Sequence, residues 1–257
     1  MDWVEKVIAS AAVPDPDLPG FPADTVQHRT VGAAGADALK EIAPFYRLIA
    51  SNANLTNARV LDFGVGWGRI LRFFVNETSR LHGVDVDADL LDECRRTKVP
   101  GEFHLVSSAG QLPYPAGSMD VAYAYSVFSH LPPALADDRI AELARVLRQG
   151  GVLVVTTQTA RFVDLCVACK AKPDPNVFEQ MYGNVFTDPA RSLADYRQGK
   201  AVYGASGGGV AVLGADVYGW AAIPPEHVAA RWGAFEVVEF IDDPGRFNQG
   251  VFVLRKR

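Results

Sequence analysis

The chain has 257 residues, of which 49% are hydrophobic and 21% charged, and its formal net charge is −5. This composition allows a sizeable globular core, and the acidic balance argues against a strongly basic face for nucleic-acid phosphates. The three cysteines (Cys94, Cys166 and Cys169) are too few for a disulfide framework. We therefore expect a cytoplasmic protein with no signal peptide, no membrane span and no nucleic-acid partner.

Residues 1–55 are interpreted as an N-terminal cap with two helices. The first helix is expected over 2–12, before a loop rich in proline between positions 14 and 22. The second is expected over 34–51, because apolar side chains recur there at helical spacing.

From residue 56 to 159, apolar runs of strand length alternate with segments of helical periodicity. The expected strands are 60–63, 81–85, 102–106, 120–125 and 152–157, and the expected helices are 70–76, 88–97 and 133–148. Gly150 and Gly151 are placed at the end of the last helix, where glycine commonly serves as a C-cap. Such alternation implies parallel strands joined by crossover helices.

Residues 160–233 interrupt this alternation with several prolines and a glycine run at 207–209. We interpret them as an insertion that forms a lid or substrate wall, within one domain that spans 1–257. Residues 234–257 predict two strands, 235–241 and 250–254, whose short connection favours an antiparallel pair.

The most informative segment is 62–68, Asp-Phe-Gly-Val-Gly-Trp-Gly, a strand that enters a glycine-rich turn before a helix. Glycine permits left-handed backbone and the close approach of a ligand. Asp85 ends the next strand, where an acid can accept the hydroxyls of a ribose. Asp62 would repel a pyrophosphate, and Gly68 comes too early for the dinucleotide pattern. These features favour a cationic, phosphate-free ligand, such as S-adenosylmethionine, over NAD.

The same segment resembles the D/E-x-G-x-G-x-G signature of class I S-adenosylmethionine-dependent methyltransferases. Segments 83–87, 112–120 and 143–153 are similar to further motifs of that family, in the same order. The resemblance covers about residues 58–157. It implies an α/β, Rossmann-like, doubly wound sheet of seven strands, mostly parallel with an antiparallel last strand, and S-adenosyl-L-methionine as the cofactor.

The resemblance also implies roles for the residues of these motifs. Gly64, Gly66 and Gly68 would line the methionine part of the cofactor, with Asp62 near its ammonium group. Asp85 would hold the ribose.

Further positions are assigned in the same way. Val86 would lie against the adenine, and Tyr125 would line the cofactor or the substrate opening. Ser108 and Ala109 stand where the family usually has an acid that meets the adenine amino group, so a hydroxyl or a backbone group would replace it.

His130 follows the fourth strand, at the edge of the sheet where ligands of open α/β folds bind. A hydroxyl acceptor needs a base, and His130 is the candidate; the alternative is a structural packing role. Arg69 either counters the cofactor carboxylate or points to solvent. No set of metal ligands is expected.

We interpret the chain as an enzyme that methylates a small molecule, with a hydroxyl of a sugar or natural product as the preferred acceptor. The chain lacks the N/D-P-P-Y/F run and the Pro-Cys pair of nucleic-acid base methyltransferases. Two alternatives stay open: a cofactor-binding sensor or non-catalytic partner subunit, and an NAD-linked oxidoreductase. The sequence does not indicate the oligomeric state.

Overall fold

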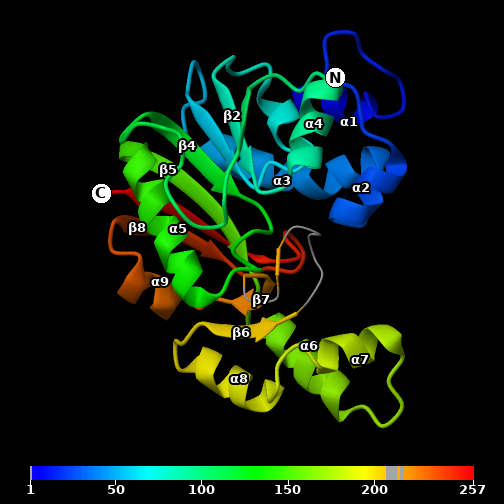
Figure 1. Cartoon of the computed structure of the whole chain (residues 1–257), viewed down its shortest axis with the longest axis vertical. Coiled ribbons are helices and arrows are strands. Elements are labelled where there is room, and N and C mark those ends of the chain that lie inside the picture. Colours follow the sequence, from blue (N-terminus) through cyan, green and yellow to red (C-terminus); the bar gives the residue numbers. More distant parts are fainter. Residues whose placement is uncertain (1, 207–212, 215–216) are drawn as a thin grey trace. The chain divides into compact units, whose positions relative to one another are not determined.

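The computed structural model describes residues 2–206, 213–214 and 217–257 (Figure 1). The chain divides into two compact units. Unit 1 consists of Met1–Ala124 and Val146–Leu153, and unit 2 consists of Tyr125–Arg145 and Val154–Arg257. The predicted glycine run at 207–209 lies outside the described residues.

Within the described residues, the strands form a seven-stranded sheet in the order β3-β2-β1-β4-β5-β9-β8 and a separate pair, β6-β7. Their bounds are β1 (Val60–Phe63), β2 (Leu81–Asp85), β3 (Glu102–Leu105), β4 (Met119–Ala124), β5 (Leu147–Thr157), β6 (Val202–Ala205), β7 (Gly219–Ala222), β8 (Phe235–Ile241) and β9 (Gly250–Lys256). Strand β1 pairs in parallel with β2 and β4, and β2 with β3, whereas the last strand, β9, is antiparallel to β8. The predicted Rossmann-like, mostly parallel sheet is therefore confirmed.

The N-terminal residues belong to the core of unit 1. The helices of this unit are α1 (Trp3–Ala9), α2 (Asp24–Val31), α3 (Gly35–Asn52), η1 (Leu71–Phe74) and α4 (Ala88–Arg96). Helix α1 packs beside α3 (Figure 1). Phe45 of α3 meets the ring of Tyr123 on β4 edge-on at 6.1 Å, and Phe74 stacks on Tyr123 at 5.4 Å. These aromatic contacts attach α3 and η1 to the central strands.

A buried cation connects the loop after α1 to the glycine-rich turn. The guanidinium carbon of Arg72 lies 4.3 Å from the ring centroid of Phe21 and 5.0 Å from that of Trp67. Its Nη1 donates to the carbonyl oxygens of Pro19 and Gly20, at 3.4 and 3.3 Å. Burial lowers the pKa of Arg72 to about 9. The loop is thus held against the turn by one side chain.

Unit 1 differs from the prediction in its short helices. The helix expected over 70–76 is the single 3₁₀ turn η1, because the glycines just before it favour turns over helix. Helix α2 lies between the expected loop at 14–22 and the helix expected over 34–51, where no helix was predicted; it buries only Gln27 and so carries no apolar periodicity. Strand β5 begins at Leu147, so Gly150 and Gly151 lie inside it and do not cap the preceding helix.

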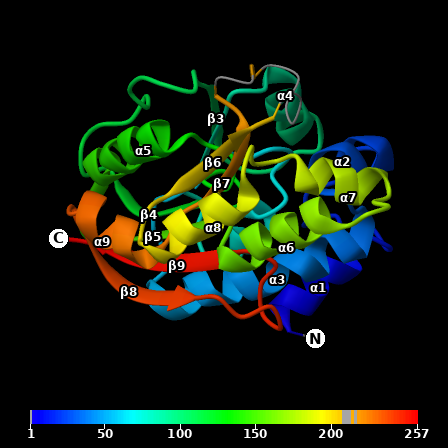
Figure 2. The same cartoon turned by 90° about the horizontal axis from the view of Figure 1, so that it is seen from below.

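Unit 2 contains the insertion and the terminal strand pair. Its helices are α5 (Pro133–Val146), α6 (Ala160–Ala171), α7 (Val177–Gly183), α8 (Pro189–Arg197) and α9 (Pro225–Arg231). Helices α6, α7 and α8 pack together, and β8 lies along β9 (Figure 2). Cys166 belongs to the apolar cluster between these helices, and both it and Cys169 are buried free thiols.

Asp137 of α5 binds three side chains of the α9 segment. Its Oδ1 accepts from Trp232 Nε1 at 2.9 Å and lies 2.9 Å from His227 Nε2. Its Oδ2 accepts from Arg231 Nε at 3.0 Å. Burial of the carboxyl would raise its pKa, but these hydrogen bonds hold the pKa of Asp137 below its ordinary value. The ionised side chain thus fastens α9 to α5.

We expect Asp137→Ala to lower the free energy of unfolding by about 2 kcal/mol at neutral pH, because it removes hydrogen bonds to a charged group. Urea unfolding followed by circular dichroism measures this. Asp138→Ala, at the exposed neighbouring position, should change stability by less than about 0.5 kcal/mol. Because the folded-state pKa of Asp137 is lowered, its stabilisation is present above pH 3.8 and lost as the pH falls through the folded value. Equal unfolding midpoints for the two variants would contradict this role.

Candidate functional site

The glycine-rich turn of unit 1 is shaped by hydrogen bonds to β2. The amides of Gly64 and Val65 both donate to the carbonyl oxygen of Val84, at 2.9 and 3.0 Å. Gly64, Gly66 and Gly68 have φ angles of +86°, +54° and +75°, in the left-handed region that favours glycine. The turn therefore needs glycine at these positions for conformational reasons alone.

Gly66 and Gly68 have different surroundings. A Cβ atom at Gly68 would lie 2.8 Å from Cγ1 of Val99, so this glycine allows close packing inside unit 1. A Cβ atom at Gly66 would meet no atom within 4 Å. Open space therefore lies beside the backbone of Gly66, where a ligand can approach.

Asp85 joins the end of β2 to this turn. Its Oδ2 accepts from the amide of Gly66 at 2.8 Å, and its Oδ1 accepts from the amide of Asp87 at 3.0 Å. Burial raises the pKa of Asp85, while these amide hydrogen bonds partly oppose the shift. Each carboxylate oxygen keeps a further lone pair for a ligand hydroxyl. Val86, which follows it, is half-buried.

Asp62 on β1 is a buried acid with spare acceptor capacity. Its side chain is 1% exposed, and Oδ2 accepts from the hydroxyl of Tyr123 at 2.9 Å. Among the described residues, Oδ1 has no hydrogen-bond partner. Burial raises the pKa of Asp62 well above its ordinary value. A cationic ligand group nearby would stabilise the ionised carboxyl, so this side chain fits a ligand that carries an ammonium.

The loop after β3 completes this edge of unit 1. Ser108 is half-buried and Ala109 exposed, and the hydroxyl of Ser107 donates to the carbonyl oxygen of Ala109. The amide of Val106 donates to the carbonyl oxygen of Asp85 at 2.9 Å, which holds the loop beside the end of β2. Since β1, β2 and β3 are parallel, the predicted residues of unit 1 gather at their carboxyl ends.

Arg69 is buried, so the expectation that it points to solvent is wrong. It is 7% exposed, and its Nη1 donates to Glu41 Oε2 at 3.0 Å and to the carbonyl oxygen of Ala38 at 3.2 Å. Both partners belong to α3. Arg69 thus does not point to solvent, because an ion pair with α3 binds it, and its charge lowers the pKa of Asp62 against the larger effect of burial.

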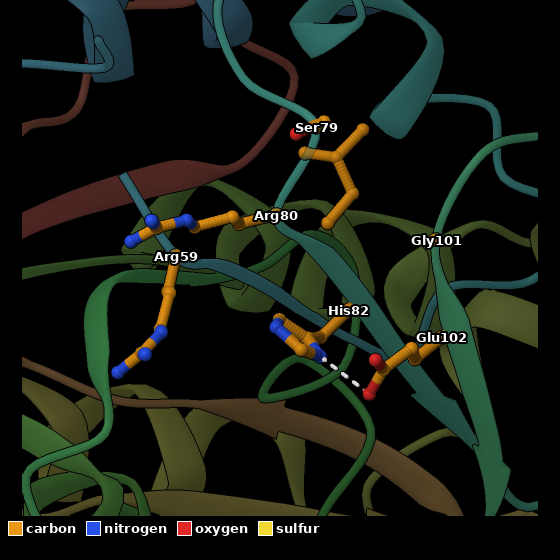
Figure 3. Close-up of a pocket in the computed structure, with 7 residues that line it drawn as sticks. Arg59, Ser79, Arg80, His82, Gly101 and Glu102 are labelled. Atoms are coloured by element: carbon orange, nitrogen blue, oxygen red, sulfur yellow. Dashed lines mark ion pairs between the residues drawn. The ribbon is translucent and has the colours of Figure 1, made fainter. Parts of the chain in front are cut away.

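A hollow of about 630 Å³ lies at the opposite edge of the same strands. Arg59, Arg80 and Glu102 stand at the amino ends of β1, β2 and β3, and they line it together with His82 (Figure 3). The Nδ1 atom of His82 lies 3.5 Å from Glu102 Oε2, while burial lowers the pKa of His82. Ligands of open α/β sheets bind at the carboxyl ends, so this hollow is separate from the predicted site.

In unit 2, the segment after β4 carries Tyr125 and His130. Tyr125 is half-buried. The Nδ1 atom of His130 lies 2.8 Å from the carbonyl oxygen of Gly219 on β7. A carbonyl oxygen can only accept, so Nδ1 carries the proton, and the neutral ring keeps its lone pair on Nε2. The geometry therefore holds this imidazole as a proton acceptor.

Aromatic rings enclose His130. Its ring stacks on Tyr218 with centroids 4.6 Å apart and 9° between the planes, and the ring of Trp220 lies 5.1 Å away. Trp220 in turn stacks on Phe162 of α6 at 4.9 Å. Burial lowers the pKa of His130, although the hydrogen bond to Gly219 opposes this. The ring is thus held neutral near neutral pH, which an acceptor of protons requires.

Comparisons with known proteins agree with this architecture. Residues 61–155 match the family model described as a methyltransferase domain. The chain is 31% identical over 137 residues to a malonyl-[acyl-carrier protein] O-methyltransferase of Enterobacter lignolyticus, across 52% of this chain and 49% of that protein. The chain spans about half the length of the curated relatives it matches.

Solved structures of methyltransferases share the fold. An S-adenosylmethionine-dependent methyltransferase from Mesorhizobium loti aligns with a TM-score of 0.55 at 15% identity, across 84% of this chain and 98% of that one. The magnesium protoporphyrin IX methyltransferase of Synechocystis, solved with bound S-adenosylhomocysteine, aligns with a TM-score of 0.53 at 15% identity, across 85% and 87%.

The sheet and the matched domain define a Rossmann-like nucleotide-binding enzyme domain. Residues 61–155 thus match a methyltransferase domain, and the chain shares the fold of solved S-adenosylmethionine-dependent methyltransferases, one of them with bound S-adenosylhomocysteine. None of the helices in the described part of the chain is both long and apolar enough to cross a membrane.

Proposed function

We propose that the chain transfers the methyl group of S-adenosyl-L-methionine to a hydroxyl of a small uncharged molecule, such as a sugar or a natural product. The observation that carries this proposal is the state of His130, a neutral imidazole whose Nδ1 is bound to the Gly219 carbonyl and whose Nε2 is an acceptor. A hydroxyl is a weak nucleophile until a base takes its proton. A neutral imidazole is the group that this step requires.

Unit 1 would hold the cofactor at the carboxyl ends of β1, β2 and β3. Its sulfonium supplies an activated methyl group. The turn at Gly64, Gly66 and Gly68 would receive the methionine part, for which open space lies beside Gly66, with Asp62 facing its ammonium. Asp85 would accept the ribose hydroxyls with the lone pairs that the backbone amides leave free.

The remaining residues of the site are assigned by their place in the chain. Val86 directly follows Asp85 and would contact the adenine. Ser108 and the backbone of Ala109 would receive the adenine amino group from the loop after β3. Tyr125, the first residue after β4, would line the opening to the acceptor.

His130 is the residue proposed to activate the acceptor. His130 would remove the hydroxyl proton as the oxygen attacks the methyl carbon, and the resulting imidazolium would release that proton to solvent. The rings of Tyr218 and Trp220 cover the imidazole and limit its contact with water.

A carboxylate acceptor is the second candidate. It is suggested by the matched relative, whose name gives O-methylation of malonyl-[acyl-carrier protein]. A carboxylate is already ionised at neutral pH and needs no base. The two candidates therefore differ in their dependence on His130.

We expect Asp85→Asn to weaken the binding of S-adenosylhomocysteine about tenfold, because two charge-assisted hydrogen bonds to the ribose become neutral. Isothermal titration calorimetry measures this. Wild-type affinity should fall as the pH falls through the raised pKa of Asp85, that is, at a pH above 3.8. Asp89→Asn, exposed on the next helix, should bind as the wild type does. Equal affinities for all three proteins would exclude Asp85 from the cofactor site.

We expect His130→Gln to bind S-adenosylhomocysteine normally and to lower kcat on hydroxyl acceptors by at least about 100-fold. The assay measures S-adenosylhomocysteine release with a panel of sugars, phenols, alcohols and carboxylic acids. Turnover of carboxylic acids alone, unaffected by His130→Gln, would favour the carboxylate acceptor. Binding of the cofactor without turnover of any compound would favour the sensor or partner-subunit interpretation.

A further inference from the structure

A chain of hydrogen bonds in unit 2 ends at His130. Thr156 Oγ1 accepts from the amide of Ser126 at 2.7 Å, so its own proton is free to donate to Gln249 Oε1, 2.6 Å away. This bond orients the Gln249 amide, whose Nε2 donates to Ser126 Oγ at 3.0 Å. Ser126 Oγ then lies 3.4 Å from Nε2 of His130. All donors in this chain point towards the imidazole.

The direction of the chain follows from hydrogen-bond capacity. Ser126 Oγ already accepts from Gln249, so its single proton remains to be donated. Two acceptors lie within reach, Ser129 Oγ and His130 Nε2, each at 3.4 Å. The unprotonated Nε2 is the stronger base, and the bond from Nδ1 to Gly219 leaves it unprotonated. The Ser126 hydroxyl therefore donates its hydrogen bond to Nε2 of His130.

Both ring nitrogens of His130 thus have partners. Nδ1 is engaged by Gly219 and Nε2 faces Ser126 Oγ, while the rings of Tyr218 and Trp220 pack against the imidazole. The hydroxyl of Ser126 is therefore the polar group next to the unprotonated Nε2. This hydroxyl belongs to the second residue after β4, whose φ is +57°.

We propose that Ser126 carries the proton from the acceptor hydroxyl to His130, and that Gln249 and Thr156 are positioning residues that hold Ser126 for this transfer. The inference rests on the proposed function. As the acceptor oxygen forms its bond to the methyl carbon, its proton passes to Ser126 Oγ and the Ser126 proton passes to His130 Nε2. The electron pair of the broken carbon–sulfur bond stays on sulfur, and the imidazolium later loses its proton to water. Ser126 ends each cycle unchanged.

The first test needs no acceptor and uses the full chain with ¹⁵N-labelled histidine. The protein has five histidines, and His130→Gln identifies the His130 signals. Nitrogen shifts should show the Nδ1–H tautomer with Nε2 as a hydrogen-bond acceptor. Ser126→Gly keeps the left-handed backbone and removes the hydroxyl, and Gln249→Leu removes the amide donor. Each should raise the pKa of His130, because the neutral ring loses a hydrogen bond.

Asn248→Ala is the matched control, since Asn248 is exposed beside Gln249. Tyr218, whose own pKa is raised by burial, is the titratable side chain stacked on His130; Tyr218→Phe keeps the ring and removes its ionisation. An Nε2–H tautomer in the wild type would overturn the proposal. The proposal would also be overturned if Ser126→Gly and Gln249→Leu left the nitrogen shifts and the pKa of His130 unchanged.

The second test uses a hydroxyl acceptor that the panel assay turns over. Ser126→Gly should lower kcat at least about 100-fold with KM nearly unchanged, and the Ser126→Gly/His130→Gln double variant should lose little more than either alone. Gln249→Leu should lower kcat less. Full kcat in Ser126→Gly beside a large loss in His130→Gln would show that His130 acts without Ser126. No turnover of any compound would instead reject the methyl-transfer function, while the histidine spectra would still decide the Ser126–His130 bond.

Discussion

The hydrogen bond from the amide of Gly66 to Oδ2 of Asp85 is the constraint on which the carboxyl edge of unit 1 depends. It ties the turn after β1 to the end of β2, and it requires a left-handed backbone that glycine adopts without strain. It also directs the carboxyl of Asp85 towards the open space beside Gly66. Asp62 on β1 is a second acid. Burial, together with the nearby charge of Asp85, raises its pKa. An edge built in this way prefers a ligand with a positive charge and no phosphate.

In unit 2, a backbone carbonyl orients the ring of His130. In many enzymes a carboxylate orients the catalytic imidazole and stabilises its charged form. Here the partner of Nδ1 is the carbonyl of Gly219, a neutral dipole, which selects the tautomer but stabilises an imidazolium less strongly. A Cβ atom at Gly219 would lie 2.3 Å from the carbonyl oxygen of Gly204 on β6. The β6–β7 pair therefore sets the tautomer of His130 through a position where only glycine fits.

The sequence was sufficient for the parts of the molecule that local patterns encode. Buried parallel strands appear as continuous apolar runs, and the glycines and acids of the turn sit at fixed distances from them. The sheet and the turn were therefore predictable. Helix α2 was not, because it buries only Gln27 and has no apolar stripe. The burial of Arg69 was not predictable either, because its partner Glu41 lies on a helix far upstream.

The surroundings of His130 were beyond prediction for a related reason. Its Nδ1 partner is a backbone carbonyl 89 residues away, and a carbonyl has no signature in the sequence. Gln249 lies 123 residues from Ser126, and nothing in its local pattern distinguishes it from a surface amide. Such contacts arise only when the tertiary fold brings distant segments together.

Arg72 connects the N-terminal loop to the glycine-rich turn, although the two segments are far apart in the sequence. The guanidinium is shared between Phe21, two loop carbonyls and Trp67, the residue between Gly66 and Gly68. Removing the loop would take away Phe21 and the two carbonyl oxygens that bind Arg72, and it would uncover one face of Trp67. The loop thus supports the carboxyl edge of unit 1, and a protein shortened past Phe21 would lose the shape of a glycine-rich turn that lies more than 40 residues further along the chain.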